Sequence, residues 1–87
     1  MHEASLMRGL MKKVEQIIDA HDGRRAVAVE VWLGALSHMS PAHFEEHFAR
    51  ASPGTRAAGA RLLIDSSDDV QHPQALDIVL KSVEVET

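Results

Sequence analysis

The first three residues, Met1, His2 and Glu3, carry donor groups that can chelate a metal ion. A free terminal amine, the amide nitrogen of His2 and its imidazole can bind one ion together, and their fused chelate rings favour a planar set of nitrogens. Planar nitrogen donors suit Ni(II) or Cu(II) better than zinc, magnesium or calcium. Glu3 adds a carboxylate that can complete the coordination or accept a hydrogen bond. The same residues are also typical of a solvated, frayed terminus, so their spacing alone leaves both interpretations open.

His43 and His47 form a second pair with metal-ligand spacing. Residues four apart are neighbours on a helix surface, so this pair could clamp an ion. The two histidines lie beside the apolar stripe of Phe44 and Phe48, at the edge of a buried face. Histidines at such a position are more often a half-exposed pair at the border of the buried face without a bound metal. The alternative interpretation is a weak secondary metal pair.

The composition indicates a small, acidic globular protein without thiol chemistry. The 87 residues suffice for one domain over 1–87, with 45% hydrophobic and 25% charged residues. The absence of cysteine excludes disulfides, thiolate catalysis and cysteine-type zinc sites. A net charge of -4 disfavours nucleic-acid binding, and no apolar run reaches the roughly 18 to 20 residues that span a bilayer. We see no secretory signal and expect a cytoplasmic location.

Motifs of enzyme active sites are missing from the sequence. Ser37, Ser40 and Ser52 do not stand in nucleophile elbows, and there is no glycine-rich phosphate loop. We therefore expect that the protein is not an enzyme.

Two helices are predicted. Apolar residues recur at three- and four-residue spacing from Leu6 to Ile18, which predicts an amphipathic helix that stops by Gly23. Gly9 weakens this helix, and a close backbone approach is one reason for a glycine there. Ser40-Pro41 predicts the N-cap and first position of a second helix, which Pro53-Gly54 ends.

Three strands are predicted from alternating apolar residues over 26–33, 60–65 and 76–86, with a polar loop over 66–74. The alternation of the last strand changes phase, which indicates either a bulge near Lys81-Ser82 or two partly covered faces. The order of elements predicts an α+β, two-layer fold: a three-stranded sheet with two helices packed on one face.

The first predicted strand has two faces of different character. Val27, Val29, Val31 and Leu33 are expected to share the buried face. Trp32 lies on the opposite face, which neither predicted helix covers. Tryptophan is enriched at binding hot spots, so Trp32 is a candidate partner interface. Burial in a homodimer and burial under the 66–74 loop remain equal alternatives.

Several motifs together resemble the HypA/HybF family of hydrogenase nickel-incorporation proteins. The matching motifs are Met1-His2-Glu3 with Ser5-Leu6, Leu33-Gly34-Ala35-Leu36-Ser37, Gly54-Thr55, Gly59-Ala60-x-Leu62-x-Ile64 and Lys81-Ser82-Val83-Glu84-Val85-Glu86. They follow one another in order and at matching spacing over nearly the whole chain. The resemblance implies the small nickel-binding domain of that family.

The resemblance also implies a function and a site. It implies a nickel-binding accessory protein, a metallochaperone, for maturation of a nickel–iron hydrogenase or another nickel enzyme. Ni(II) would be held by the Met1 amine, the His2 imidazole and amide, and Glu3 as an auxiliary carboxylate. The implied partners are a maturation GTPase and the hydrogenase large subunit. The alternative is a metal-free protein-interaction module that kept the fold and lost nickel delivery.

The sequence departs from the family pattern in three places. Family members insert two Cys-x-x-Cys pairs that bind zinc, whereas residues 66–74 form only a loop with His72 as the sole candidate ligand. No structural zinc is therefore expected, and nickel binding is better supported than nickel delivery. Ala58 stands where the family commonly has an acidic residue, and Trp32 where charged or polar residues are common.

Overall fold

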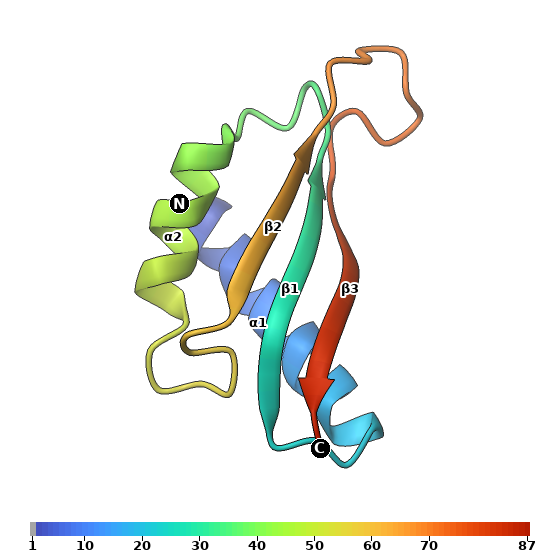
Figure 1. Ribbon diagram of the computed structural model, residues 1–87. Helices are drawn as coiled ribbons and strands as arrows, with labels where there is room; N and C mark the ends of the chain where they lie inside the picture. The colour runs from blue at the N-terminus through green and yellow to red at the C-terminus, as the bar shows by residue number, and fades with distance from the viewer. Residues whose placement is uncertain (1) are drawn as a thin grey trace.

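The computed structural model describes residues 2–87, with side chains described from Ala4 onward. Two helices lie against one face of a three-stranded sheet, which confirms the predicted α+β, two-layer fold (Figure 1). The elements are α1 (His2–Ala20), β1 (Arg25–Leu33), α2 (Pro41–Ala51), β2 (Arg61–Ser66) and β3 (Ile78–Glu86). Within the described part of the chain, no helix is both long and apolar enough to cross a membrane.

The sheet has the strand order β2-β1-β3, so the first strand lies in the centre. β1 runs parallel to β2 and antiparallel to β3. A parallel pair needs a crossover connection, and α2 supplies it between β1 and β2. The central strand is accordingly the most buried of the three.

α1 buries the predicted apolar stripe and ends in a tight reversal. The N–H of Gly23 donates to the carbonyl of Ile18 at 2.8 Å, and the N–H of Asp22 donates to that of Asp19 at 3.1 Å. This pair of bonds is the Schellman arrangement, and its left-handed residue is Asp22, with φ of 52°, rather than Gly23. Gly23 is needed for space instead, since a Cβ there would overlap Val85 Cγ1.

Gly9 of α1 does not have the role considered from the sequence. A Cβ at this position would meet no atom of another residue within 4 Å. The expectation of a close backbone approach at Gly9 is therefore wrong, and the glycine only loosens an exposed turn of the helix.

Bulges decide which residues of the sheet face the helices. β3 skips Lys81 in its pairing with β1, because Glu30 pairs with Ser82 and Val31 with Leu80. The bulge predicted near Lys81-Ser82 is thus confirmed, and it brings both halves of the strand against one core.

A second bulge, in β1, was not predicted. Pairing jumps from Ala26–Val85 to Ala28–Glu84, which leaves Val27 as the extra residue. Val27 is only half-buried and Ala26 takes the core position, so the expectation that Val27 shares the core face with Val29 is wrong. An extra residue in a strand inverts the alternation of buried and exposed side chains on one side of it. A prediction that assumes strict alternation along the whole strand therefore misses the bulge.

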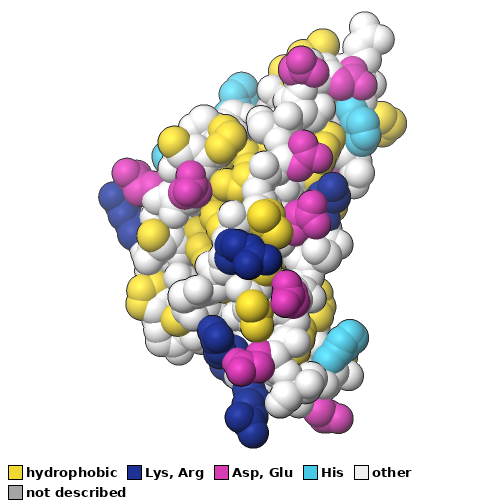
Figure 2. All heavy atoms as spheres, in the orientation of Figure 1, with side chains coloured by type: hydrophobic (Ala, Val, Ile, Leu, Met, Phe, Trp, Pro, Cys, Tyr) yellow, Lys and Arg dark blue, Asp and Glu magenta, His cyan; other side chains and the backbone are white. Residues whose placement is uncertain are grey.

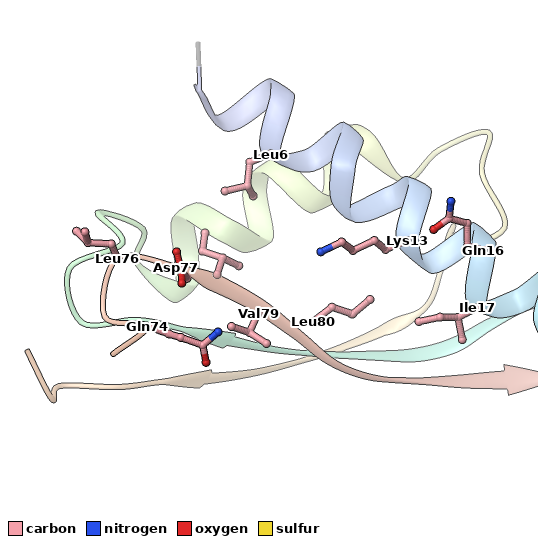
Figure 3. A pocket seen from close by; sticks show the side chains of 10 residues that line it. Leu6, Lys13, Gln16, Ile17, Gln74, Leu76, Asp77, Val79 and Leu80 are labelled. Atoms are coloured by element: carbon pink, nitrogen blue, oxygen red, sulfur yellow. The ribbon is translucent and has the colours of Figure 1, made fainter. Parts of the chain in front are cut away.

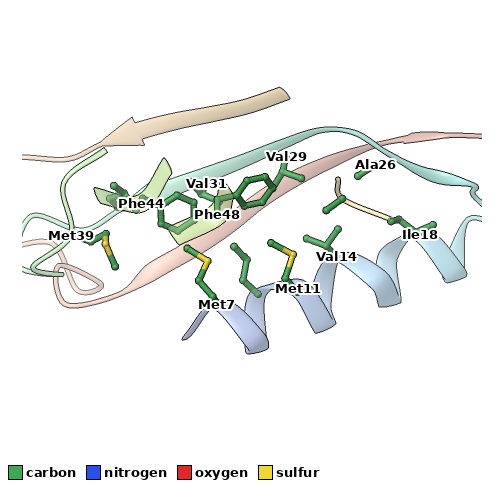
Figure 4. Close-up of a cluster of buried hydrophobic side chains, with 13 residues drawn as sticks. Met7, Met11, Val14, Ile18, Ala26, Val29, Val31, Met39, Phe44 and Phe48 are labelled. Atoms are coloured by element: carbon green, nitrogen blue, oxygen red, sulfur yellow. The ribbon is translucent and has the colours of Figure 1, made fainter. Parts of the chain in front are cut away.

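The core lies between the helices and the sheet (Figure 4). It joins methionines and aliphatic residues of α1, the two phenylalanines of α2 and the inner face of β1. Its buried members are Met7, Leu10, Met11, Val14, Ile18, Ala26, Val29, Val31, Leu33, Met39, Phe44, Phe48 and Ala57. Partly buried residues of β2 and β3 complete it, including Leu62, Ile64 and Val83.

α2 begins and ends where local chemistry predicts. Ser40 Oγ accepts a hydrogen bond from the N–H of His43 at 3.1 Å, and Pro41 occupies the first helical position. Gly54 follows the helix with φ of 82°, a conformation that glycine adopts without steric cost. The last strand begins at Ile78, later than expected, because Leu76 lies in the preceding turn with 71% of its surface exposed.

Candidate metal centre

Two of the three residues predicted to bind nickel, His2 and Glu3, belong to α1. The backbone of His2 and Glu3 forms the first residues of this helix. Met1 and the side chains of His2 and Glu3 lie outside the part of the chain that the structure describes, so their ligand roles stay a prediction. Ala4 is the first residue whose side chain is described, and it is exposed.

A groove of about 780 Å³ runs between α1 and α2, beside the start of α1. Ala4, Met7 and Met11 line it from α1, and His47 and Arg50 line it from α2. The first described turn of α1 and the histidine-bearing face of α2 therefore border the same space. His47, one of the two candidate histidines of α2, thus borders the same groove as Ala4, the first residue whose side chain is described.

His43 and His47 are in direct contact, as their spacing predicts. Their Nε2 atoms lie 3.1 Å apart and their ring centroids 4.7 Å apart, with an angle of 42° between the rings. His43 is exposed and His47 is half-buried at the groove. Only His47 is half-exposed as expected of a boundary position, and the ring edges that carry Nε2 face each other.

The capping of α2 fixes the position of this pair. Ser40 is the N-cap, and its Oγ accepts a hydrogen bond from the N–H of His43, so the helix begins at Pro41. Phe44 and Phe48 bury the adjacent stripe, so the histidines must lie at its border. Among residues 2–87 with described side chains, no group of three or more His, Asp or Glu side chains is placed to hold one ion. Within residues 4–87, no third His, Asp or Glu side chain is therefore placed to complete the coordination of an ion on the pair.

His72, the sole candidate ligand of the 66–74 loop, contacts other residues of the chain through both a hydrogen bond and its ring. Its Nδ1 accepts a hydrogen bond from the N–H of Gln74 at 2.9 Å. Its ring lies on Trp32, with 4.7 Å between ring centroids. Sequence reasoning considered burial of Trp32 by this loop but did not identify His72 as the contact. The loop covers part of the Trp32 face, and Trp32 remains half-exposed.

The rest of the outer sheet face carries paired charges. Lys81 Nζ lies 3.5 Å from Glu30 and 3.7 Å from Asp65, so one lysine bridges three strands. Ser82 donates to Glu30 at 3.1 Å. Figure 2 shows this face, with charged side chains of both signs distributed around smaller apolar areas. Charge pairing makes a solvated outer face compatible with a single copy of the chain.

A second groove, of about 670 Å³, separates α1 from the start of β3 (Figure 3). Leu6 and Ile17 of α1 and Leu80 of β3 form its apolar surface. Lys13 and Asp77 extend from opposite sides. The groove is open and mixed in character, and it gathers no candidate metal ligands from the sequence analysis.

Comparison with known proteins identifies the family. The family model described as "Hydrogenase/urease nickel incorporation, metallochaperone, hypA" matches residues 1–72. The match includes the start of α1, both helices, β1, β2 and most of the 66–74 loop.

Curated relatives carry the same family name. The chain is 32% identical over 65 residues to the hydrogenase maturation factor HypA of Desulfitobacterium hafniense, an alignment that covers 75% of this chain and 57% of that protein. It is 38% identical over 65 residues to HypA of Geobacter sulfurreducens, again with 75% of this chain and with 56% of that protein covered. The alignments thus span little more than half the length of these relatives.

Solved structures share the fold. The solution structure of the Ni metallochaperone HypA from Helicobacter pylori superposes with a TM-score of 0.82 at 18% identity, covering 97% of each chain. A second solution structure of a HypA protein gives a TM-score of 0.71 at 18% identity, covering 98% of this chain and 96% of the other. Because the family model matches residues 1–72 of this chain and the curated relatives are more than 30% identical over 75% of it, the chain belongs to the HypA family of hydrogenase/urease nickel-incorporation proteins.

Proposed function

We propose that this protein binds Ni(II) as cargo and acts as an accessory protein in the maturation of a nickel enzyme, a hydrogenase in the first instance. The observation that carries the proposal is the family match, which begins at residue 1 and so includes Met1-His2-Glu3. The names of the relatives support it: hydrogenase maturation factor for the curated proteins, and Ni metallochaperone for the Helicobacter pylori structure.

The proposed site consists of the Met1 amine, the amide and imidazole nitrogens of His2, and Glu3 as an auxiliary carboxylate. Adjacent nitrogens at a chain terminus can form fused chelate rings, and such planar donors favour Ni(II). Ala4, which follows the proposed ligands in the sequence, is exposed and lines the groove of Met7 and His47.

We propose further that residues 1–87 act as a single nickel-binding domain, in which the 66–74 loop replaces a zinc module. His72 packs on Trp32 and accepts from Gln74, so its contacts support a structural role rather than zinc binding. A maturation GTPase and a hydrogenase large subunit are the proposed partners. The cytoplasmic location and the absence of enzymatic activity expected from the sequence stay predictions.

The decisive test is a Ni(II) titration of untagged protein with a native N-terminus, followed by calorimetry and visible absorption. We expect one tightly bound equivalent with a planar-nickel absorption band, and we expect His2→Ala to abolish this tight binding and its band. N-terminal acetylation is a sharper variant, because it keeps His2 but removes the terminal amine as a donor. His21→Ala, which alters an exposed histidine beyond the end of α1, is the matched control.

Identical nickel binding by the native protein and His2→Ala would overturn the terminal site. The second candidate function, a metal-free interaction module, would then be favoured by the half-exposed Trp32. That candidate predicts association through the sheet face, measured by sedimentation, which Trp32→Ala weakens and His2→Ala leaves unchanged.

A further inference from the structure

The contact between His43 and His47 has the dimensions of a metal-binding pair. Transition metals bind imidazole nitrogen at about 2.0 to 2.1 Å. An ion at that distance from both Nε2 atoms, which are 3.1 Å apart, would subtend an N–metal–N angle of roughly 95 to 100°. This value lies between the right angle of planar or octahedral coordination and the wider tetrahedral angle. The helix therefore already holds the two nitrogens at a usable separation.

The chemistry of the donors selects the class of ion. Two imidazoles suit Ni(II), Cu(II) and Zn(II), and they suit Mg²⁺ or Ca²⁺ poorly. In the metal-free protein, one Nε2–H donates to the other Nε2. An ion bound by both Nε2 atoms would replace that shared hydrogen bond with two coordinate bonds, and the Nε2 proton of the donating ring would move to its Nδ1 by exchange with solvent. The ring positions need only small adjustments because the nitrogens are already adjacent.

We propose that His43 and His47 form a second transition-metal site, on α2 and separate from the N-terminal residues. Two protein ligands leave several coordination positions to water or to a ligand from another molecule, so the site would bind weakly and exchange its ion readily. His43 is exposed, which gives an ion direct access from solvent.

Two features of the surroundings bear on this site. Glu45 and Glu46 lie between the two histidines in the sequence of α2, and Arg50 forms an ion pair with Glu46 at 3.6 Å. Ser40 Oγ binds the first-turn N–H of His43, which reduces the positive end of the helix dipole that an ion would meet. His47 also lines the groove that begins at Ala4, so the pair lies on the same side of the molecule as the start of α1.

The test separates the pair from the terminal residues. Full-length His2→Ala protein is titrated with Ni(II) alone, by calorimetry and by following paramagnetic broadening of backbone amide signals. We expect one weak equivalent with broadening centred on residues 43–47. Adding His43→Ala should weaken the binding at least about tenfold, because even groups that only orient ligating histidines contribute 10- to 100-fold.

A matched variant controls for the number of histidines. His21→Ala in the same His2→Ala background removes one exposed histidine that has no partner at four-residue spacing, and its nickel affinity should not change. The proposal is overturned if His2→Ala protein binds no nickel, or if His43→Ala and His21→Ala bind it equally. Every measurement uses the His2→Ala background, in which the proposed N-terminal site is already disrupted. The result for His43 and His47 therefore does not depend on whether the N-terminal residues bind nickel.

Discussion

The side chain of Arg56 ties the connection between α2 and β2 to α1 by donating from Nε to Glu15 Oε1 at 2.6 Å. The backbone N–H of Arg56 donates to the other carboxylate oxygen of Glu15 at 3.0 Å, and its guanidinium reaches Asp19 at 2.7 Å. Arg56 lies 41 positions from Glu15 in the sequence and 37 positions from Asp19. A single arginine thus holds the long connection after α2 against the helix that carries the proposed nickel terminus.

The Glu15–Arg56 contact predicts a stability difference between two charge variants. Glu15→Ala should lower the melting temperature by a few degrees, because it also leaves the Arg56 N–H without its partner. Glu46→Ala removes an exposed pair at 3.6 Å and should have almost no effect. Thermal unfolding followed by circular dichroism measures both, and equal effects would contradict a special role of Glu15.

The same contact predicts resistance to alkali. Hydrogen bonds to Asp19 and then to Glu15 raise the pKa of Arg56 above its ordinary value. A raised folded-state pKa means that the stabilisation is complete below the unfolded pKa and is lost only as pH rises through the folded pKa. The melting-temperature difference between wild type and Arg56→Gln should therefore stay constant from about pH 8 to pH 11. A difference that shrinks across this range would contradict the assignment.

Gly9 and Gly34 predict opposite responses to alanine. Gly9→Ala should stabilise the protein by about 0.5 to 1 kcal/mol, since the added Cβ meets no neighbour and the helix gains propensity. Gly34→Ala should destabilise it, because a Cβ there would overlap the backbone of Ala75 and Gln74, which cannot easily move. The free energies of unfolding of the two variants are compared by urea unfolding. A loss of stability in Gly9→Ala would contradict the finding that a Cβ at this position meets no neighbour.

Phe44 anchors α2 in the core and predicts the largest stability loss of these variants. Its side chain is fully buried, so Phe44→Ala should cost about 3 to 5 kcal/mol. Leu76→Ala is the matched control, because Leu76 is 71% exposed and its truncation should change stability by less than about 0.5 kcal/mol. Urea unfolding of both proteins checks the prediction.

Trp32 and His72 predict a fluorescence change. Trp32 is the only tryptophan and the chain has no tyrosine, so emission reports this one side chain. His72→Ala removes the ring that lies 4.7 Å from the indole and should shift the emission to longer wavelength and increase quenching by acrylamide. His21→Ala should leave both unchanged. If Trp32 is instead covered by a second copy of the chain, the emission will depend on protein concentration in wild type.

Much of the fold was predictable because it follows from local rules. The N-cap of Ser40 with Pro41, and the contact between His43 and His47, depend on residues at most four positions apart. The phase change near Lys81 indicated a bulge as one of two alternatives, and the pairing of β3 with β1 shows the bulge. The resemblance of Met1-His2-Glu3 and the later motifs anticipated the family that the comparisons identify.

The sequence by itself therefore determined the helices, the strands and the α+β architecture, since three- and four-residue spacing and alternation report burial of one face of each element. Tertiary structure alone decided that Val27 bulges out of β1, that Gly9 faces open space and that Arg56 binds Glu15. It also decided that His72, from the loop between β2 and β3, covers Trp32. Strand register and contacts between distant residues depend on how all the elements pack together, and no local pattern contains that information.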